Sequence, residues 1–282
     1  MNSELEKTIM AAGDLPAMPV VAAKVMQLVE DERATADELA KIVASDPAVA
    51  ARVMKISNSP LYGCQRQTQT LPGAIMLMGF NTLKSIVVVA YLKDVFKPVG
   101  LMEKMLWEHA FGAGLAARVI AADIRQVNPE EAFLAGLMHD IGKLIMYNQD
   151  KTKFQKVVER YYNEEVWFEV AEKDVYPFTH AEVGGCVLKK WNFPDELVEA
   201  VLQHHTFDGT GEEEPYRKNI IAVTSLANLF CIKLGIGERE PRPELDLAEV
   251  PAVTHLKLDN ERLEFLLDKF LEIYERDKSY FS

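Results

Sequence analysis

Apolar residues recur along this chain at the three- and four-residue spacing of helices, and the strict alternation typical of strands is scarce. After Pro19, valine and leucine side chains share one helical face between positions 21 and 29, and the stripe ends at the charged residues 30–33. A second long stripe, near the C-terminus, includes Leu263, Leu266 and Phe270. The pattern predicts an all-α protein.

Capping and breaking residues predict that the helices of the first hundred residues are short. Thr35 and Glu38 have the spacing of a capping box. Asp46 before Pro47 is typical of a helix start, and a residue before proline disfavours helix, so Asn58-Ser59-Pro60 should end that helix. We expect further short helices from Pro72 to Gly79 and from a cap at Asn81 to about Phe96.

Longer helices are predicted beyond a seam at residues 97–100. The expected helices span about 102–124, 130–148, 180–191, 195–205, 218–235 and 259–279, and a further one includes 164–173. The proline- and charge-rich segment 237–251 is predicted to be a loop. We therefore predict three parts: an N-terminal helical lobe (1–98), a helical subdomain (99–236), and a loop with a terminal helix (237–282).

Composition and charge narrow the classes of function. Apolar residues make up 49% of the 282 residues, enough for a substantial core, and the net charge of −12 argues against broad cationic surfaces for nucleic acid or anionic lipid. No signal peptide or membrane span is visible. The cysteines Cys64, Cys186 and Cys231 form no CxxC pair and are expected to be reduced thiols. We expect a cytoplasmic protein with no nucleic-acid or membrane partner.

The stretch GLMHDIGKL (136–144) raises the question of chemistry. Asp140 lies at the edge of the apolar face of the predicted helix 130–148, and an unpaired buried carboxylate costs several kcal/mol, so a cation is the expected remedy. Taken alone, an HD dipeptide is more often a surface feature. The pair His204-His205 at a helix end has an equally ordinary explanation, and His255 is expected to have no special role.

The set of histidines is more specific than any one of them. HDIGK (139–143) is followed by HHTFDGTG (204–211), and the order His109, His139-Asp140, His180, His204-His205 resembles the HD superfamily of metal-dependent phosphohydrolases. The resemblance to its two-metal members, which include the HD-GYP phosphodiesterases, implies that His109 and His139 hold one ion, that His180, His204 and His205 hold the other, and that Asp140 bridges both. Lys143 matches the lysine that contacts substrate phosphate.

The N-terminal half resembles the start of the HDOD domain. The matching features are LPAMP (15–19), the helix capped by Asp46-Pro47, NSPLYG (58–63) and AIMLMGFNTLKSIV (74–87). The resemblance covers about residues 12–235. It implies an N-terminal lobe of short helices packed on an HD-type helical bundle, and a role in bacterial signalling. Many HDOD domains have lost the metal ligands, and no general enzymatic activity is established for them.

The chain departs from both patterns. The last ligand of the HD hydrolases is an aspartate, and the matching position is Asn228, whose amide oxygen can coordinate but is neutral. The sequence after His205 runs into EEEPY, without the Gly-Tyr-Pro signature. Hydrolysis of a cyclic dinucleotide therefore does not follow from the resemblance.

Two classes of function remain open. The resemblance favours a signalling module with a retained metal site, which acts through a signalling protein partner or a phosphate-containing small molecule. The alternative is a metal-dependent phosphohydrolase or phosphodiesterase acting on a nucleotide or cyclic dinucleotide, with Asp140 and Lys143 in the catalytic site. In either case imidazole and carboxylate ligands suit one or two ions of Fe, Mn, Zn or Ni.

Overall fold

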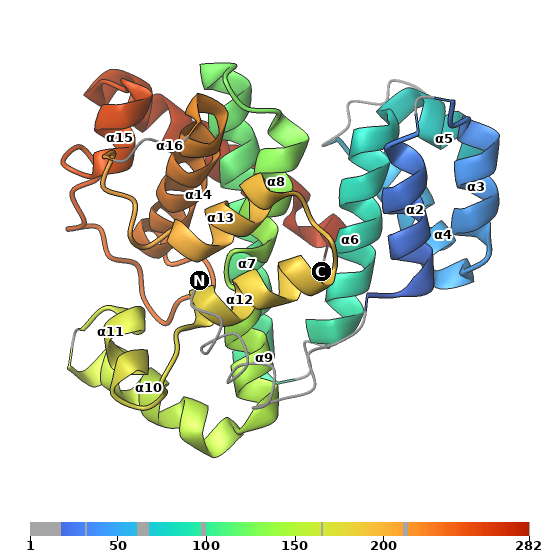
Figure 1. Ribbon diagram of the computed structural model, residues 1–282. Coiled ribbons are helices and arrows are strands. Elements are labelled where there is room, and N and C mark those ends of the chain that lie inside the picture. The colour runs from blue at the N-terminus through green and yellow to red at the C-terminus, as the bar shows by residue number, and fades with distance from the viewer. Residues whose placement is uncertain are drawn as a thin grey trace. The chain divides into compact units, whose positions relative to one another are not determined.

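The computed structural model describes residues 18–31, 33–60, 68–96, 100–164, 166–210 and 214–281 (Figure 1). Every regular element in these ranges is a helix and none is a strand, which confirms the all-α prediction. The helices form two compact units. Parts of the predicted motifs lie outside the described residues: 15–17 of LPAMP, 61–63 of NSPLYG, Cys64, 97–99 of the seam, and Gly211.

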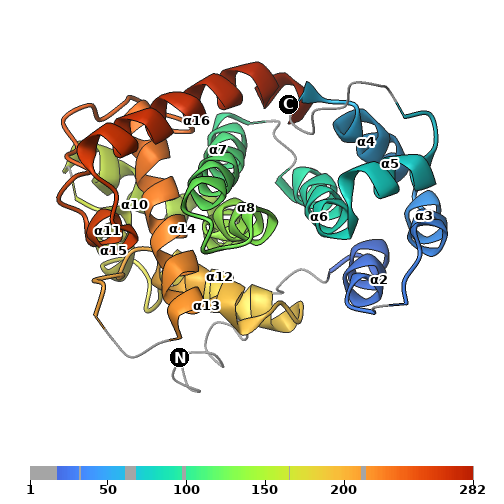
Figure 2. The same cartoon turned by 90° about the horizontal axis from the view of Figure 1, so that it is seen from above.

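The smaller unit contains residues 18–98 and the C-terminal residues from Phe265 onward. Its helices are α2 (Val20–Val29), α3 (Ala36–Ala44), α4 (Pro47–Ser57), α5 (Leu71–Met78) and α6 (Phe80–Phe96). Figure 2 shows α2 to α5 grouped on one side of α6. Fully buried side chains such as Leu39, Ile75 and Leu83 fill the space between them.

The helix ends of this unit follow the capping chemistry of the sequence. Thr35 and Glu38 form both hydrogen bonds of a capping box, and the Asp46 carboxylate accepts from the N–H groups of Ala48 and Val49. Asn81 does not cap α6, contrary to expectation. Gly79, with a φ of 82°, makes a sharp bend that lets the next helix begin directly at Phe80.

The larger unit extends from Val99 to Glu264. Its helices are α7 (Leu101–Ile124), α8 (Pro129–Met138), α9 (Ile141–Gln149), α10 (Lys151–Asn163), α11 (Phe168–Lys173), α12 (His180–Lys190), α13 (Asp195–Gln203), α14 (Pro215–Leu234), α15 (Pro251–Leu256) and the start of α16 (Asn260–Phe281). Helix α7 packs along α8, and α14 packs against both (Figure 1). Helix α12 lies between α9 and α13.

The predicted continuous helix 130–148 is wrong, because the chain bends at His139-Asp140. Asp140 has φ and ψ of −103° and 12°, outside the helical region, and it is the N-cap residue of α9. The Lys143 N–H donates to the Asp140 carbonyl oxygen and closes the first turn of α9. The HD pair therefore lies at a helix junction, where both side chains can leave the helix surfaces.

Two further predictions need correction. The helix expected around 164–173 is shorter, since α11 begins only at Phe168, after the extended Trp167. Helix α10 was not predicted, although the Asp150 carboxylate caps it by accepting from the Lys153 N–H. Its many charged residues obscure the apolar stripe that contains Phe154 and Tyr161.

The third predicted part, 237–282, is divided between the two compact units. Residues 237–264 belong to the larger unit and 265–282 to the smaller one. The ammonium group of Lys233 donates to the carbonyl oxygens of Pro243 and Leu245, which holds the loop to the end of α14. Arg262 pairs with Asp123 of α7.

No single helix among the described residues is long and apolar enough to cross a membrane; α5 and α6 meet that criterion only when taken together, as a pair bent by 115°.

The close approach of α9 to α12 generates a prediction about stability. A Cβ atom on Gly142 would overlap the backbone carbonyl oxygen of His180, whereas one on Gly185 would meet only the flexible side chain of Leu202. We expect Gly142→Ala to lower the free energy of unfolding by roughly 1–3 kcal/mol, the usual cost of overpacking. The matched variant Gly185→Ala should cost clearly less. Denaturant titration followed by circular dichroism compares the two, and equal losses would contradict this account of the contact.

Candidate metal centre

The histidines and the carboxylate singled out in the sequence converge in the larger unit. His139 and Asp140 lie at the α8–α9 junction, and His109 projects from the middle of α7. The capping box of Thr179 and Glu182 starts α12 and makes His180 its first residue. His204 and His205 directly follow α13. All are buried except His205, which is half-buried.

Imidazole nitrogens surround both oxygens of the Asp140 carboxylate. Oδ2 lies 3.3 Å from Nε2 of His139 and 3.6 Å from Nε2 of His109. Oδ1 lies 3.1 Å from Nε2 of His180 and 3.7 Å from Nε2 of His204. The carboxylate thus faces two histidines with each of its oxygens.

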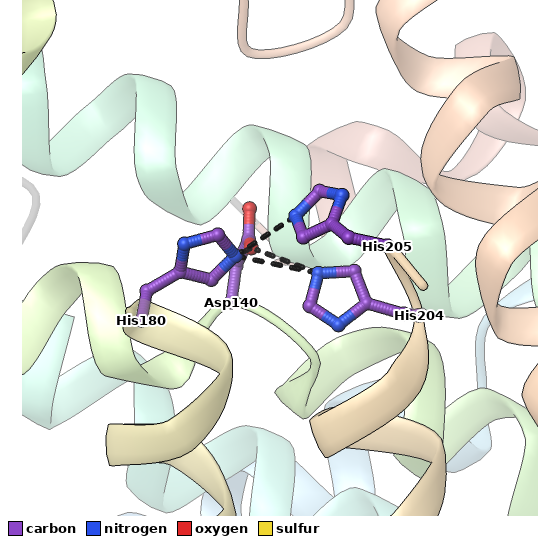
Figure 3. A group of neighbouring side chains, drawn as sticks. All are labelled: Asp140, His180, His204 and His205. Carbon is purple, nitrogen blue, oxygen red and sulfur yellow. Dashed lines mark hydrogen bonds and ion pairs between the residues drawn. The ribbon is translucent and has the colours of Figure 1, made fainter. Parts of the chain in front are cut away.

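These side chains form two groups that share Asp140. Asp140, His180, His204 and His205 offer ligand atoms within 4.8 Å of one another, and Figure 3 shows the three rings converging on the carboxylate. His109, His139 and Asp140 form the second group by the same criterion. Each group could hold a metal ion. The division of the ligands is the one that the resemblance to the two-metal hydrolases implies.

The outer nitrogens fix the direction of four rings. Nδ1 of His109 lies 3.0 Å from the Ile236 carbonyl oxygen, and Nδ1 of His139 lies 2.6 Å from the Gly136 carbonyl oxygen. Nδ1 of His204 lies 2.7 Å from the Val201 carbonyl oxygen, and Nδ1 of His180 lies 2.8 Å from the Glu172 carboxylate. Carbonyl and carboxylate oxygens only accept, so Nδ1 carries the proton in each ring. In the neutral tautomer the Nε2 lone pair then points at Asp140, as in metal sites.

This arrangement is unfavourable without a cation. Lone pairs of the neutral His109 and His204 rings face a carboxylate, and Nε2 of His139 is buried without a hydrogen-bond partner. Leaving such groups unsatisfied costs about 1–3 kcal/mol each. A divalent cation bound between them would satisfy the lone pairs and offset the charge. The residues therefore fit a metal ion.

Lys143 supplies the cation nearest to the carboxylate. Its Nζ lies 2.7 Å from Oδ2 of Asp140 and 4.4 Å from the centre of the Phe168 ring. Burial opposes the charge of Asp140, but His139 and Lys143 outweigh it and hold the pKa of this carboxyl well below its usual value. Burial likewise opposes the charge of Lys143, but Asp140 raises its pKa.

Four of these histidines fall into two groups, with pKa values lowered in three rings and raised in His180. Burial lowers the pKa of His109, and burial together with neighbouring imidazoles lowers the pKa of His204 and His205 well below the usual value. These rings are neutral at pH 7, as ligands must be. Burial also acts to lower the pKa of His180, but the carboxylates of Glu172 and Asp140 raise it to about 9.

Asn228 lies beside His109, on α14. Its Oδ1 is 2.9 Å from Nε2 of His109, and the side chain is buried. With Nδ1 protonated, the ring has no second proton to donate to this oxygen. A cation between the two atoms would accept a lone pair from each.

Two carboxylates near the centre were missed in the sequence. Glu172 is fully buried and accepts hydrogen bonds from both the backbone N–H and Nδ1 of His180. Glu238 lines the small cavity beside His109, Asp140 and Lys143. Both belong to runs of charged residues in the sequence, which are indistinguishable from a solvated surface. His255 lies apart from the cluster, with Nε2 2.9 Å from Oδ1 of Asn219.

Comparison with known proteins identifies similar chains. Residues 15–207 match the family model of the HDOD domain. An HDOD domain protein of unknown function from Geobacter sulfurreducens is 24% identical, with a TM-score of 0.79 over 98% of this chain and 96% of that one. A candidate phosphohydrolase from Shewanella amazonensis SB2B is 20% identical, with a TM-score of 0.73 over 99% and 97%. At these identities the likeness shows the fold.

One relative is longer than this chain. An uncharacterized protein of Treponema pallidum (strain Nichols) is 21% identical over 217 residues, which are 77% of this chain and 42% of that protein. The chain therefore spans less than half the length of the curated relative that it matches.

The shared position of Asp140 predicts how metal content responds to mutation. We expect one or two equivalents of transition metal in protein purified without chelator, with two as the full occupancy of such a site. Asp140→Ala should remove nearly all of it, because both groups lose their only carboxylate, whereas His109→Ala should spare the group of His180. His255→Ala is the control and should retain the metal. Elemental analysis measures all four proteins, and equal losses in the first two variants would contradict the bridging position.

The contact between Glu172 and His180 generates a second prediction. Glu172→Ala removes the acceptor that orients the ring and should weaken metal affinity by about 10- to 100-fold. Below pH 9 the metal must displace a proton from His180 in the wild type, so wild-type affinity should rise as the pH rises towards 9. Competition against a metal-binding dye measures both effects. Glu164→Ala, a nearby surface carboxylate, should behave as the wild type; a loss of similar size there would exclude a specific role for Glu172.

Proposed function

The chain belongs to the HDOD domain family, and from this premise we propose that it is a regulatory module that binds two transition-metal ions and, through them, a phosphate-bearing small molecule. The convergence of four imidazole Nε2 atoms on one buried carboxylate, with His205 in the same group, is the observation that carries the proposal. A signalling protein is the expected partner of the complex.

The ligand set suggests how the ions are held. His109, His139, Asp140 and Asn228 would bind one ion, and Asp140 with His180, His204 and His205 would bind the other. Imidazole with few carboxylates suits Fe, Mn, Zn or Ni. When bound, the ions supply positive charge that attracts and polarises a phosphoryl group, so the net charge of −12 is no obstacle.

The cavity beside the centre supports a phosphate ligand. His109, Asp140 and Lys143 line it together with Glu238 and mainly apolar and aromatic side chains. Lys143 is buried and charged, so its ammonium group can contact a phosphate oxygen. The cavity itself is small, about 40 Å³, so its contribution is the position of Lys143 beside the metal centre.

Asn228 favours regulation over catalysis. A neutral amide stands where the hydrolases that the chain resembles have a charged ligand, which weakens the hold on one ion. Lys143 also already pairs with Asp140, so part of the carboxylate charge is offset before any cation binds. A binding module tolerates a weakly held ion better than a two-metal enzyme does.

Hydrolysis is the second candidate, and the shared carboxylate favours it. Two ions with a common ligand can activate a water molecule between them for attack on a phosphate ester. Lys143 would then stabilise the negative charge that develops on the phosphoryl oxygens. The substrate would be a phosphomonoester or phosphodiester.

Asn228→Asp separates the two candidates. The added carboxylate should increase metal retention, because it supplies a charged ligand beside His109. The control Asn219→Asp adds the same charge to α14 but lies next to His255, and should leave metal content unchanged. We expect turnover to remain low or undetectable with a chromogenic phosphodiester, a phosphomonoester and cyclic dinucleotides, each with Mn²⁺ or Fe²⁺.

Each outcome of these assays has a definite meaning. Turnover by the wild type that disappears in Asp140→Ala would establish the hydrolase instead of the regulatory module. No turnover in either protein at full occupancy, with binding of orthophosphate retained, supports the regulatory module. Unchanged or lower metal content in Asn228→Asp would remove Asn228 from the ligand set.

A further inference from the structure

A second cavity adjoins the one beside the metal centre. It has a volume of about 580 Å³, within the usual range of small-molecule sites, and the loop after α14 forms one of its walls. Tyr161 and Tyr162 line both cavities, so the two share a wall. Nothing in the proposed metal chemistry requires this second space.

Two arginines line the second cavity and supply positive charge there. The guanidinium carbon of Arg239 lies 4.5 Å from the centre of the Tyr162 ring, and that of Arg242 lies 4.6 Å from the centre of the Tyr161 ring. Neither side chain forms an ion pair with a carboxylate in the described part of the chain. A guanidinium stacked on a ring keeps its in-plane N–H groups available, and these match a phosphate group in bidentate fashion.

The backbone at both arginines is held in place by hydrogen bonds from its N–H groups. The Arg239 N–H donates to the hydroxyl oxygen of Tyr162, which itself donates to Glu238. The Arg242 N–H donates to carbonyl oxygens of Ile232 and Lys233 at the end of α14. Such preorganisation lowers the entropic cost of binding.

The same segment contacts the metal centre. The carbonyl oxygen of Ile236 accepts from Nδ1 of His109, and a Cβ atom on Gly237 would collide with the backbone and Cβ of His109. Glu238 lines the cavity beside the metal centre, the inner cavity, and Arg239 lines the second or outer cavity. Residues 236–242 therefore connect the contact with His109 to the two stacked guanidinium groups.

From this placement we propose that Arg239 and Arg242 bind a second phosphate group of a ligand whose first phosphate is bound at the metal ions. The carboxylates of Glu240 and Glu244 line the outer cavity as well, and they would accept hydrogen bonds from hydroxyl groups between the two phosphates. The ligand class is thus a bisphosphorylated, hydroxyl-bearing molecule such as a nucleotide. This inference rests on the proposed function, which supplies the first phosphate site.

The test compares probes that differ by one phosphate. Calorimetry on the Mn²⁺-loaded full chain measures the affinity for orthophosphate, adenosine 5′-monophosphate and adenosine 3′,5′-bisphosphate. We expect the bisphosphate to bind about tenfold more tightly than the monophosphate, the equivalent of one charge-assisted hydrogen bond. The double variant Arg239→Gln/Arg242→Gln should lose this difference and keep the wild-type affinity for orthophosphate.

A matched control removes two charges elsewhere. Arg33→Gln/Lys41→Gln alters exposed cations of the smaller unit and should retain the tenfold preference. Circular dichroism and metal content verify that each variant is folded and loaded. Arg239→Lys/Arg242→Lys, which keeps the charge but loses the planar fork, should give an intermediate preference.

The failures of the two proposals are distinguishable. If orthophosphate and the monophosphate bind but the bisphosphate is no tighter, or if the arginine variant weakens all three probes equally, the second phosphate site is overturned and the proposed function stands. If orthophosphate does not bind while the bisphosphate still binds in an arginine-dependent way, the proposed function is overturned and the arginine site stands. If no probe binds, both are overturned.

Discussion

The buried carboxylate of Asp140 is the constraint on which the rest of the larger unit depends. A carboxylate removed from water must be compensated by positive charge or hydrogen bonds. Here Lys143 compensates one oxygen directly and His180 faces the other, while the neutral rings of His109 and His204 present lone pairs rather than protons. The cluster therefore fits a cation, which would satisfy the lone pairs that face the carboxylate.

The fold meets this constraint by bringing helix ends together. The junction of α8 and α9 carries His139 and Asp140, the first residue of α12 is His180, and His204 and His205 follow the last turn of α13. Backbone carbonyls exposed at these ends accept the Nδ1 protons of His139 and His204, so the helix termini orient the rings. Gly142 permits α9 to approach α12 closely enough for Asp140 and His180 to meet.

The loop after α14 connects the candidate metal centre to the second cavity. It supplies the carbonyl oxygen that orients His109, a carboxylate for the inner cavity and two stacked guanidinium groups for the outer one. A ligand that engaged the arginines would contact a segment that already contacts the metal centre. Binding of phosphate and binding of metal would then be linked by mass action rather than by a conformational change.

The sequence by itself determined the helical class, most helix boundaries in the first hundred residues, and the histidines and aspartate that converge. These follow from local chemistry: capping boxes, proline and glycine positions, apolar periodicity, and spacing that resembles a known family. Tertiary structure alone decided that His139-Asp140 lies at a bend, that Glu172 orients His180, and that residues 236–242 pack on His109. The charged run around Glu172 looks solvent-exposed in the sequence, because its burial arises only when distant helices meet.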